Sequence, residues 1–134
     1  MNLLDGEWPD ATDVVARYLI AAQDVPVRWA VPNPRPSQFV VVRRVGSGAP
    51  LQWADRASLD VECWSGEPNG NPKPAHLLAA SIRRTLLAMP DADNPVASVS
   101  ILGVAYSPDT VALVPRVVLG VEVLLRPSDP LTSA

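Results

Sequence analysis

The sequence contains one cysteine, Cys63, and one histidine, His76. A single cysteine excludes a disulfide within the chain and a cysteine-based metal cluster, and it favours a reducing compartment such as the cytosol. Cys63 falls on the apolar side of a strand pattern, where a thiol acts as a small hydrophobic group. A metal site on His76 would need carboxylate ligands, and Glu67, the nearest, lies across a proline-rich loop. We therefore expect no metal, no cofactor and a solvent-facing His76.

The sequence also lacks a basic excess. Its net charge is -3 at pH 7, which disfavours a protein that binds nucleic acid by neutralising phosphates. No apolar run approaches the ~20 residues of a membrane-spanning helix. The first twenty residues hold several acids and no base before Arg17, the reverse of the start of a signal peptide. We expect neither a signal peptide nor contact with a membrane.

What the sequence does contain is enough hydrophobic residues for one core. The chain has 134 residues, of which 48% are hydrophobic and 19% are charged. A chain of this length buries roughly two-thirds of its unfolded surface on folding. We expect a single domain over 1–134, with a proline-rich connection at 31–37 and a short C-terminal tail at 127–134. Each of these two segments could be a connector or an arm on a neighbouring subunit.

Two segments have the pattern of amphipathic helices. Asp10 can cap a helix over 11–23, whose apolar residues form one stripe. The second helix is predicted over 74–89, because proline suits the first turn of a helix and Pro90 stops one.

Five segments have the composition or the alternation of strands. They are residues 27–30, 38–45, 56–64, 96–106 and 116–126. The first is predicted to be a short edge strand, whereas the second is apolar on both faces and is predicted to be central. The second and third are close in sequence and should pair antiparallel after a turn at "VGSG". The predicted fold class is α+β, a two-layer sandwich with a mainly antiparallel sheet and two helices packed on one face.

The third strand, "RASLDVECW", places Asp60, Glu62 and Trp64 on one face, for another subunit or for water. Its two carboxylates are about 7 Å apart by strand geometry, a separation that could serve paired-carboxylate chemistry. Because no other catalytic group accompanies them, a solvated face is the better interpretation, and we expect no enzymatic activity. Arg43 and Arg44 on the neighbouring strand could pair with these carboxylates within one subunit or between subunits.

The tryptophans leave two interpretations open. Trp29, Trp53 and Trp64 lie on the charged side of a strand or near loops. Exposed tryptophans often mark contact surfaces. Each of the three could equally belong to the core.

The order of these segments resembles a known family. After a capped first helix come "QFVVVRRVGSG", "DRASLDVECWS", the helix "AHLLAASIRRTLLAM", a late "YSPD" and a closing "PRVVLGVEVLLR". Together they resemble the tail-terminator, or tail-completion, proteins of long-tailed bacteriophages, especially those of actinobacterial hosts. The resemblance runs from about Pro9 to Arg126. It implies an α+β sandwich that assembles as a homohexameric ring, caps the tail tube, ends its polymerisation and provides the surface that docks to the head.

The resemblance also implies a place and partners. The protein would be a structural component of the virion at the head-to-tail junction, assembled in the host cytoplasm. Its partners would be other copies of itself, the major tail tube protein and head-completion or connector proteins, while genomic DNA would pass without specific binding. The candidate residues of the subunit or tube interface are Arg43, Arg44, Asp60, Glu62, Trp64, Glu67, Tyr106, Asp109 and Arg116.

Three alternatives stay open. Another head-to-tail connector protein is the nearest, because such proteins share small α+β scaffolds. A small-molecule-binding module or enzyme could use Asp60 and Glu62 in a cleft. A nucleic-acid-binding regulator would need a basic aromatic face, which the sequence does not provide.

Overall fold

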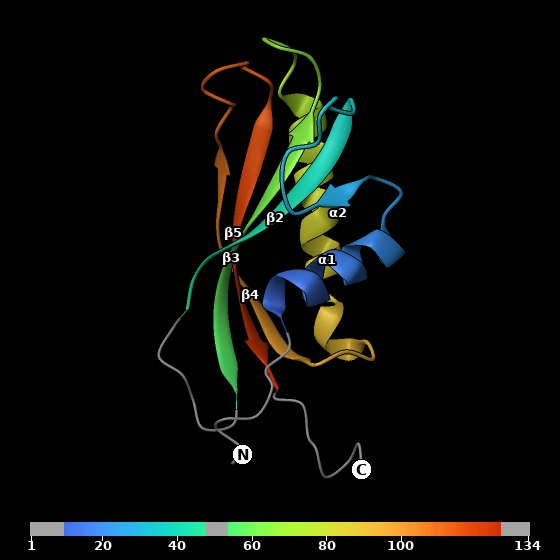
Figure 1. Ribbon diagram of the computed structural model, residues 1–134, viewed down its shortest axis with the longest axis vertical. Coiled ribbons are helices and arrows are strands. Elements are labelled where there is room, and N and C mark those ends of the chain that lie inside the picture. The colour runs from blue at the N-terminus through green and yellow to red at the C-terminus, as the bar shows by residue number, and fades with distance from the viewer. Residues whose placement is uncertain (1–9, 48–53, 127–134) are drawn as a thin grey trace.

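Figure 1 shows the computed structural model, which describes residues 10–47 and 54–126. A twisted sheet forms one layer, and both helices pack on one of its faces. The predicted fold class is therefore confirmed. The elements in chain order are α1 (Ala11–Ala22), β1 (Val27–Arg28), β2 (Gln38–Ser47), β3 (Asp55–Ser65), α2 (Lys73–Leu87), the short 3₁₀ helix η2 (Met89–Asp91), β4 (Val96–Tyr106) and β5 (Arg116–Leu125).

The strands are ordered β1-β2-β3-β5-β4 across the sheet. β1 pairs parallel with β2, and all other neighbours are antiparallel, including the predicted pair of β2 and β3. β3 is central and is paired on both sides along its length. The two edges differ, because β1 has two residues and β4 has eleven.

The helix ends follow the signals in the sequence closely. The Asp10 carboxylate accepts hydrogen bonds from the backbone N–H groups of Thr12 and Asp13, at 2.9 and 3.3 Å, so the predicted cap is confirmed. α1 ends one residue earlier than predicted. α2 begins at Lys73 and ends at Leu87, since the chain tightens into η2 around Pro90 before β4.

The main core lies between the helices and the sheet. Alternate residues of β2, β3 and β5 face α1 and α2, as the period-two pattern predicts. This face of the sheet includes Val40, Val42, Ala57, Leu59, Val61, Cys63, Val117, Leu119, Val121, Val123 and Leu125. From the helices, the largest buried side chains are Val15, Leu19, Leu78, Ile82 and Leu86.

A second, smaller core lies on the opposite face of the sheet. It consists of Phe39, Val41, Trp64 and Val114, with Val31 and Ala112 packed against it. The proline-rich connection and the loop 107–115 supply its cover, and both gather at one end of the sheet (Figure 1). β2 is apolar on both faces because one face contributes to the main core and the other to this second core.

Parts of the predicted pattern lie outside the described residues. These are the turn that follows Ser47, Trp53 and the C-terminal tail. The first strand is shorter than predicted, ending at Arg28 rather than at residue 30. The region from there to Gln38 has neither helix nor strand, as predicted for a proline-rich connection.

The buried thiol of Cys63 gives a test of the main core. Burial, and secondarily the carboxylate of Glu62, raise the pKa of this thiol from 9.0 to about 12. We expect a thiol reagent such as DTNB to leave the native protein unmodified at pH 8 and to react fully in urea, because the thiolate is the nucleophile. Rapid modification of the native protein would contradict the burial.

The same shift predicts a dependence of stability on pH. Between pH 9 and about 12 the unfolded chain loses the thiol proton while the folded chain keeps it. The free energy of unfolding should therefore fall as the pH rises through this range. Urea titrations at pH 8 and pH 10 should show a smaller fall for Cys63→Ala than for the wild type. An equal fall in both proteins would mean that Cys63 ionises normally when folded.

Candidate functional site

Charged side chains gather on the sheet face opposite the helices. On β2, β3 and β5 the residues that alternate with the main core point to this face. Three bases and three acids lie there, namely Arg43, Arg56 and Arg116, and Asp60, Glu62 and Glu122.

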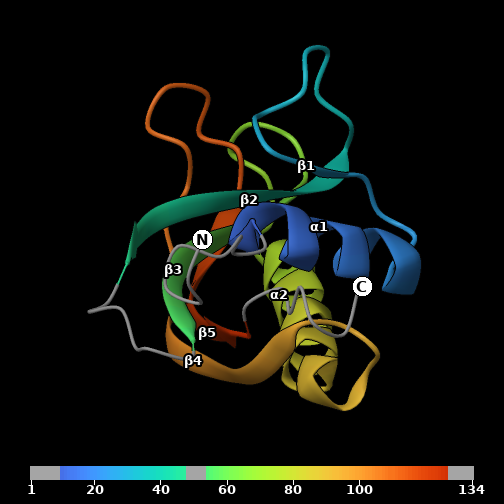
Figure 2. The ribbon, with the colours of Figure 1, turned by 60° about the horizontal axis from the view of Figure 1, so that its bottom comes forward.

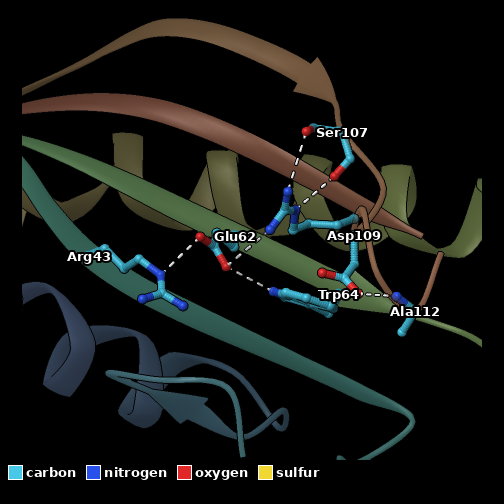
Figure 3. Close-up of polar contacts among 7 residues, drawn as sticks. Arg43, Glu62, Trp64, Ser107, Asp109 and Ala112 are labelled. Carbon is cyan, nitrogen blue, oxygen red and sulfur yellow. Dashed lines mark hydrogen bonds and ion pairs between the residues drawn. The ribbon is translucent and has the colours of Figure 1, made fainter. Parts of the chain in front are cut away.

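Glu62 is the centre of this group (Figure 3). Its Oε2 accepts a hydrogen bond from Nε of Arg43, on β2, at 3.0 Å. Its Oε1 accepts one from Nε1 of Trp64, on the same strand, at 3.1 Å. Arg116, on β5, places Nη1 at 3.9 Å from Oε1. One carboxylate therefore joins three neighbouring strands, and the pairing of Arg43 with Glu62 within one subunit is confirmed.

The Glu62 side chain is only 9% exposed, whereas those of Arg43 and Arg116 are 44% and 20% exposed. A carboxylate removed from water is tolerated when charged donors and hydrogen bonds replace its hydration. The two guanidinium groups and the indole N–H provide this replacement. The expectation that Glu62 is free for water or for another subunit is therefore wrong.

Trp64 is also buried, with 3% of its surface exposed. Its ring stacks on Phe39 with centroids 5.2 Å apart. The guanidinium carbons of Arg116 and Arg35 lie 5.1 and 5.7 Å from the ring centroid, within the range of cation–π attraction. Of the two interpretations of this tryptophan, the exposed contact residue is wrong and the core residue is confirmed.

Arg116 and Asp109 fix the loop that covers Trp64. Nε of Arg116 donates to the backbone oxygen of Ser107 at 2.7 Å, and Nη2 lies 3.4 Å from the Ser107 hydroxyl. The Asp109 carboxylate accepts from the N–H of Ala112 at 2.6 Å, which closes a turn in which Leu113 has a φ of +57°. Both residues act within the subunit as supports of loop 107–115.

The other candidate interface residues make no contact with Glu62 that compares with those of Arg43, Trp64 and Arg116. Asp60 is the cross-strand partner of Arg43 in the register of β2 and β3. Arg44 points to the helix side of the sheet, 3.5 Å from Asp55. Tyr106 is also on the helix side, where its ring stacks on the exposed His76 with centroids 5.4 Å apart. The structure thus brings together Arg43, Glu62, Trp64 and Arg116, but not the whole predicted set.

Glu67 lies at a pocket formed by three connections at one end of the sheet. The pocket has a volume of about 240 Å³ and is lined by Arg35, Pro36, Ser37, Phe39, Gly66, Glu67, Pro68, Ala112 and Val114. Opposite charges, on Arg35 and Glu67, flank an apolar floor. Asp60 and Glu62 do not line it.

Residues 10–47 and 54–126 contain no cluster of three or more histidine, cysteine, aspartate or glutamate side chains suited to a metal ion. Within the same ranges, the helices are too short or too polar to cross a membrane. Trp29 is about half exposed and lies outside both cores.

Sequence reasoning missed three residues of this arrangement. Arg35, Phe39 and Ser107 each contact Trp64 or Arg116. Arg35 stands between two prolines, which is a weak signal of a positioned side chain. The shorter contact of Ser107 with Arg116 is made through its backbone oxygen, which every residue type has, and the longer one through its hydroxyl.

Comparison with solved structures finds chains with a similar fold. No family model and no curated protein matches the chain. Among solved structures, the chain is similar to a chain of the virion of a native gene transfer agent particle, with a TM-score of 0.56 and 18% sequence identity. The match covers 88% of this chain and 87% of that one. At this identity the comparison establishes a shared fold.

We call Glu62 with Arg43, Trp64 and Arg116 the Glu62 cluster. It predicts that a Glu→Gln substitution costs more stability at residue 62 than at residue 122 on the same face. Glu62→Gln removes the charge that two arginines share, and we expect a loss of about 1–3 kcal/mol in the free energy of unfolding. Glu122→Gln is the matched control, because its pair with Arg56 spans 3.7 Å and both side chains are over a third exposed. The control substitution should lower the free energy of unfolding by no more than about 1 kcal/mol. Urea titrations would contradict the account if the two variants lost equal stability.

Proposed function

We propose that the protein is a structural component of a phage-like virion that forms a homohexameric ring on the tail tube. The ring ends polymerisation of the tube and presents the surface that docks to the head. The observation that carries this proposal is the fold shared with a chain of a gene transfer agent virion over 88% of the sequence. The order of helices and strands that resembles tail-terminator proteins supports it independently.

The Glu62 cluster supports a structural role over an enzymatic one. A general acid or base must reach its substrate, yet the Glu62 carboxylate is covered and already bound to Arg43 and Trp64. Cys63 is buried and its pKa is raised, so its thiol is a poor nucleophile. We therefore propose no catalytic residue.

The Glu62 cluster also affects whether the arginines on this face can bind DNA. In the proposed ring, genomic DNA passes through the channel without specific binding. The three bases on the open face of β2, β3 and β5 stand among three acids, and Arg43 and Arg116 are turned towards Glu62. Phosphates on DNA would have to compete with that carboxylate for both guanidinium groups.

We expect the purified protein not to bind duplex DNA at physiological salt. Fluorescence anisotropy of a labelled duplex should stay at its free value when protein is added. Binding that persists at physiological salt would instead favour the nucleic-acid-binding alternative, and it would have to involve bases other than the two held by Glu62.

The proposed function is tested directly on tail tubes. Native mass spectrometry and negative-stain microscopy would follow the purified protein, alone and mixed with tubes assembled from a phage major tail protein. We expect six-copy rings at the tube ends and tubes that stop growing. Monomers that never form rings and never cap tubes would overturn the proposal. Rings that bind tail-less heads but not tubes would favour another head-to-tail connector.

A further inference from the structure

The two edges of the sheet are protected very differently. Natural sheets block their edges with short strands, prolines or charges, because free N–H and C=O groups invite pairing with another chain. β1 has such protection, since it has two residues, follows Pro26 and precedes the proline-rich connection. β4 has eleven residues with neither a proline nor a charge. It lies at the opposite edge and, among residues 10–47 and 54–126, pairs with β5 alone, in a register interrupted by two bulges, between Val96 and Ser98 and between Ile101 and Gly103.

The surface beside β4 is apolar and basic, and we call it the β4–α2 flank. Val104 and Tyr106 are 53% and 43% exposed on the helix side of β4, whereas Leu102, 63% exposed at the bulge, lies towards Gly120 on the opposite face of the sheet. Val104 also lines a shallow pocket of about 130 Å³ with His76 and Arg83 of α2. α2 contains three bases and no acid.

The opposite side of the molecule is apolar and acidic, and we call it the α1–β1 flank. Ile20 and Trp29 are 47% and 48% exposed there. Asp24 lines a groove of about 430 Å³ between the end of α1 and α2. Residues 10–28 contain three acids and two bases; Arg17 pairs with Asp13, and Arg28 donates to the backbone oxygen of Val27.

Each flank has an exposed charge without an ion-pair partner among the described residues, and these two charges are opposite in sign. Arg83 and Asp24 are both exposed, and neither has an ion pair with another described residue. The flanks lie on opposite sides of the molecule, with β4 on one side and β1 and α1 on the other (Figure 2). Two different, complementary patches per subunit are what a head-to-tail contact requires.

We infer that the β4–α2 flank packs against the α1–β1 flank of the next copy of this chain. Val104 and Tyr106 meet the neighbour's apolar surface, and Arg83 of one copy faces Asp24 of the next. This inference rests on the proposed ring and names the surfaces that build it. The same contact covers the outer edge of β4, where two bulges interrupt the strand but neither a proline nor a charge blocks pairing.

A charge exchange tests the contact. Arg83→Glu and Asp24→Arg should each raise the concentration needed for half-assembly at least about tenfold, because each places like charges together. The double variant R83E/D24R restores opposite charges and should assemble nearly as well as the wild type. Arg84→Glu is the matched control, since Arg84 lies about 100° farther round the helix and does not line the pocket beside β4.

A lysine substitution on β4 tests the apolar part of the proposed contact between subunits. Val104→Lys should block assembly, whereas Val111→Lys, at a loop residue that is 90% exposed, should not. Urea titrations of the monomers show whether each variant is folded. Sedimentation velocity and negative-stain microscopy, with and without tail tubes, measure assembly. Hydrogen exchange of the wild type should slow in residues 96–106 when rings form.

The outcomes separate this inference from the proposed function. Folded flank variants that form rings as well as the wild type would overturn the inference and leave the ring intact. Flank variants that form rings but no longer bind tubes would also overturn it, because the flank would then face the tube. A wild type that forms no rings under any condition would overturn both. Loss of rings in the flank variants, with rescue by R83E/D24R and normal controls, would establish the contact.

Discussion

A carboxylate in the middle of a sheet is the constraint on which the rest of this structure depends. Glu62 lies on the central strand and has lost most of its contact with water. Its charge requires donors, and these come from β2 on one side and β5 on the other. Since Arg116 also holds Ser107, and the indole of Trp64 both donates to Glu62 and packs on Phe39, the same interaction fixes the loop end of the sheet.

This arrangement decides which surfaces are left for partners. The charged side chains on the sheet face opposite the helices first suggest a binding face. Two of its arginines, Arg43 and Arg116, already form ion pairs with Glu62 within the subunit. Exposed apolar side chains lie along the β4 edge, on the end of α1 and next to β1, and others lie on α2, at Val45 of β2 and in loop 107–115. In the ring that we propose, the two flanks make the contacts between subunits, and the sheet face opposite the helices makes none of them.

The sequence predicts those features that depend on neighbouring residues. The alternation in β3 identifies its inner face, and Asp10 identifies the start of α1, because each signal acts over one to four residues. The burial of Trp64 could not be predicted in the same way. Its cover comes from Arg35, Phe39 and Val114, which are distant in sequence and belong partly to segments without periodicity. For the same reason Glu62 has the pattern of a surface residue, although side chains from β2, β3 and β5 surround it.

A reconstruction of the assembled protein by electron cryo-microscopy would test this account most directly. We expect a closed ring in which the β4–α2 flank of each subunit meets the α1–β1 flank of the next. Within every subunit, Arg43, Trp64 and Arg116 should still surround Glu62. The account would be contradicted by a ring in which Glu62 pairs with arginines of a neighbouring copy, or in which the edge of β4 is open to solvent.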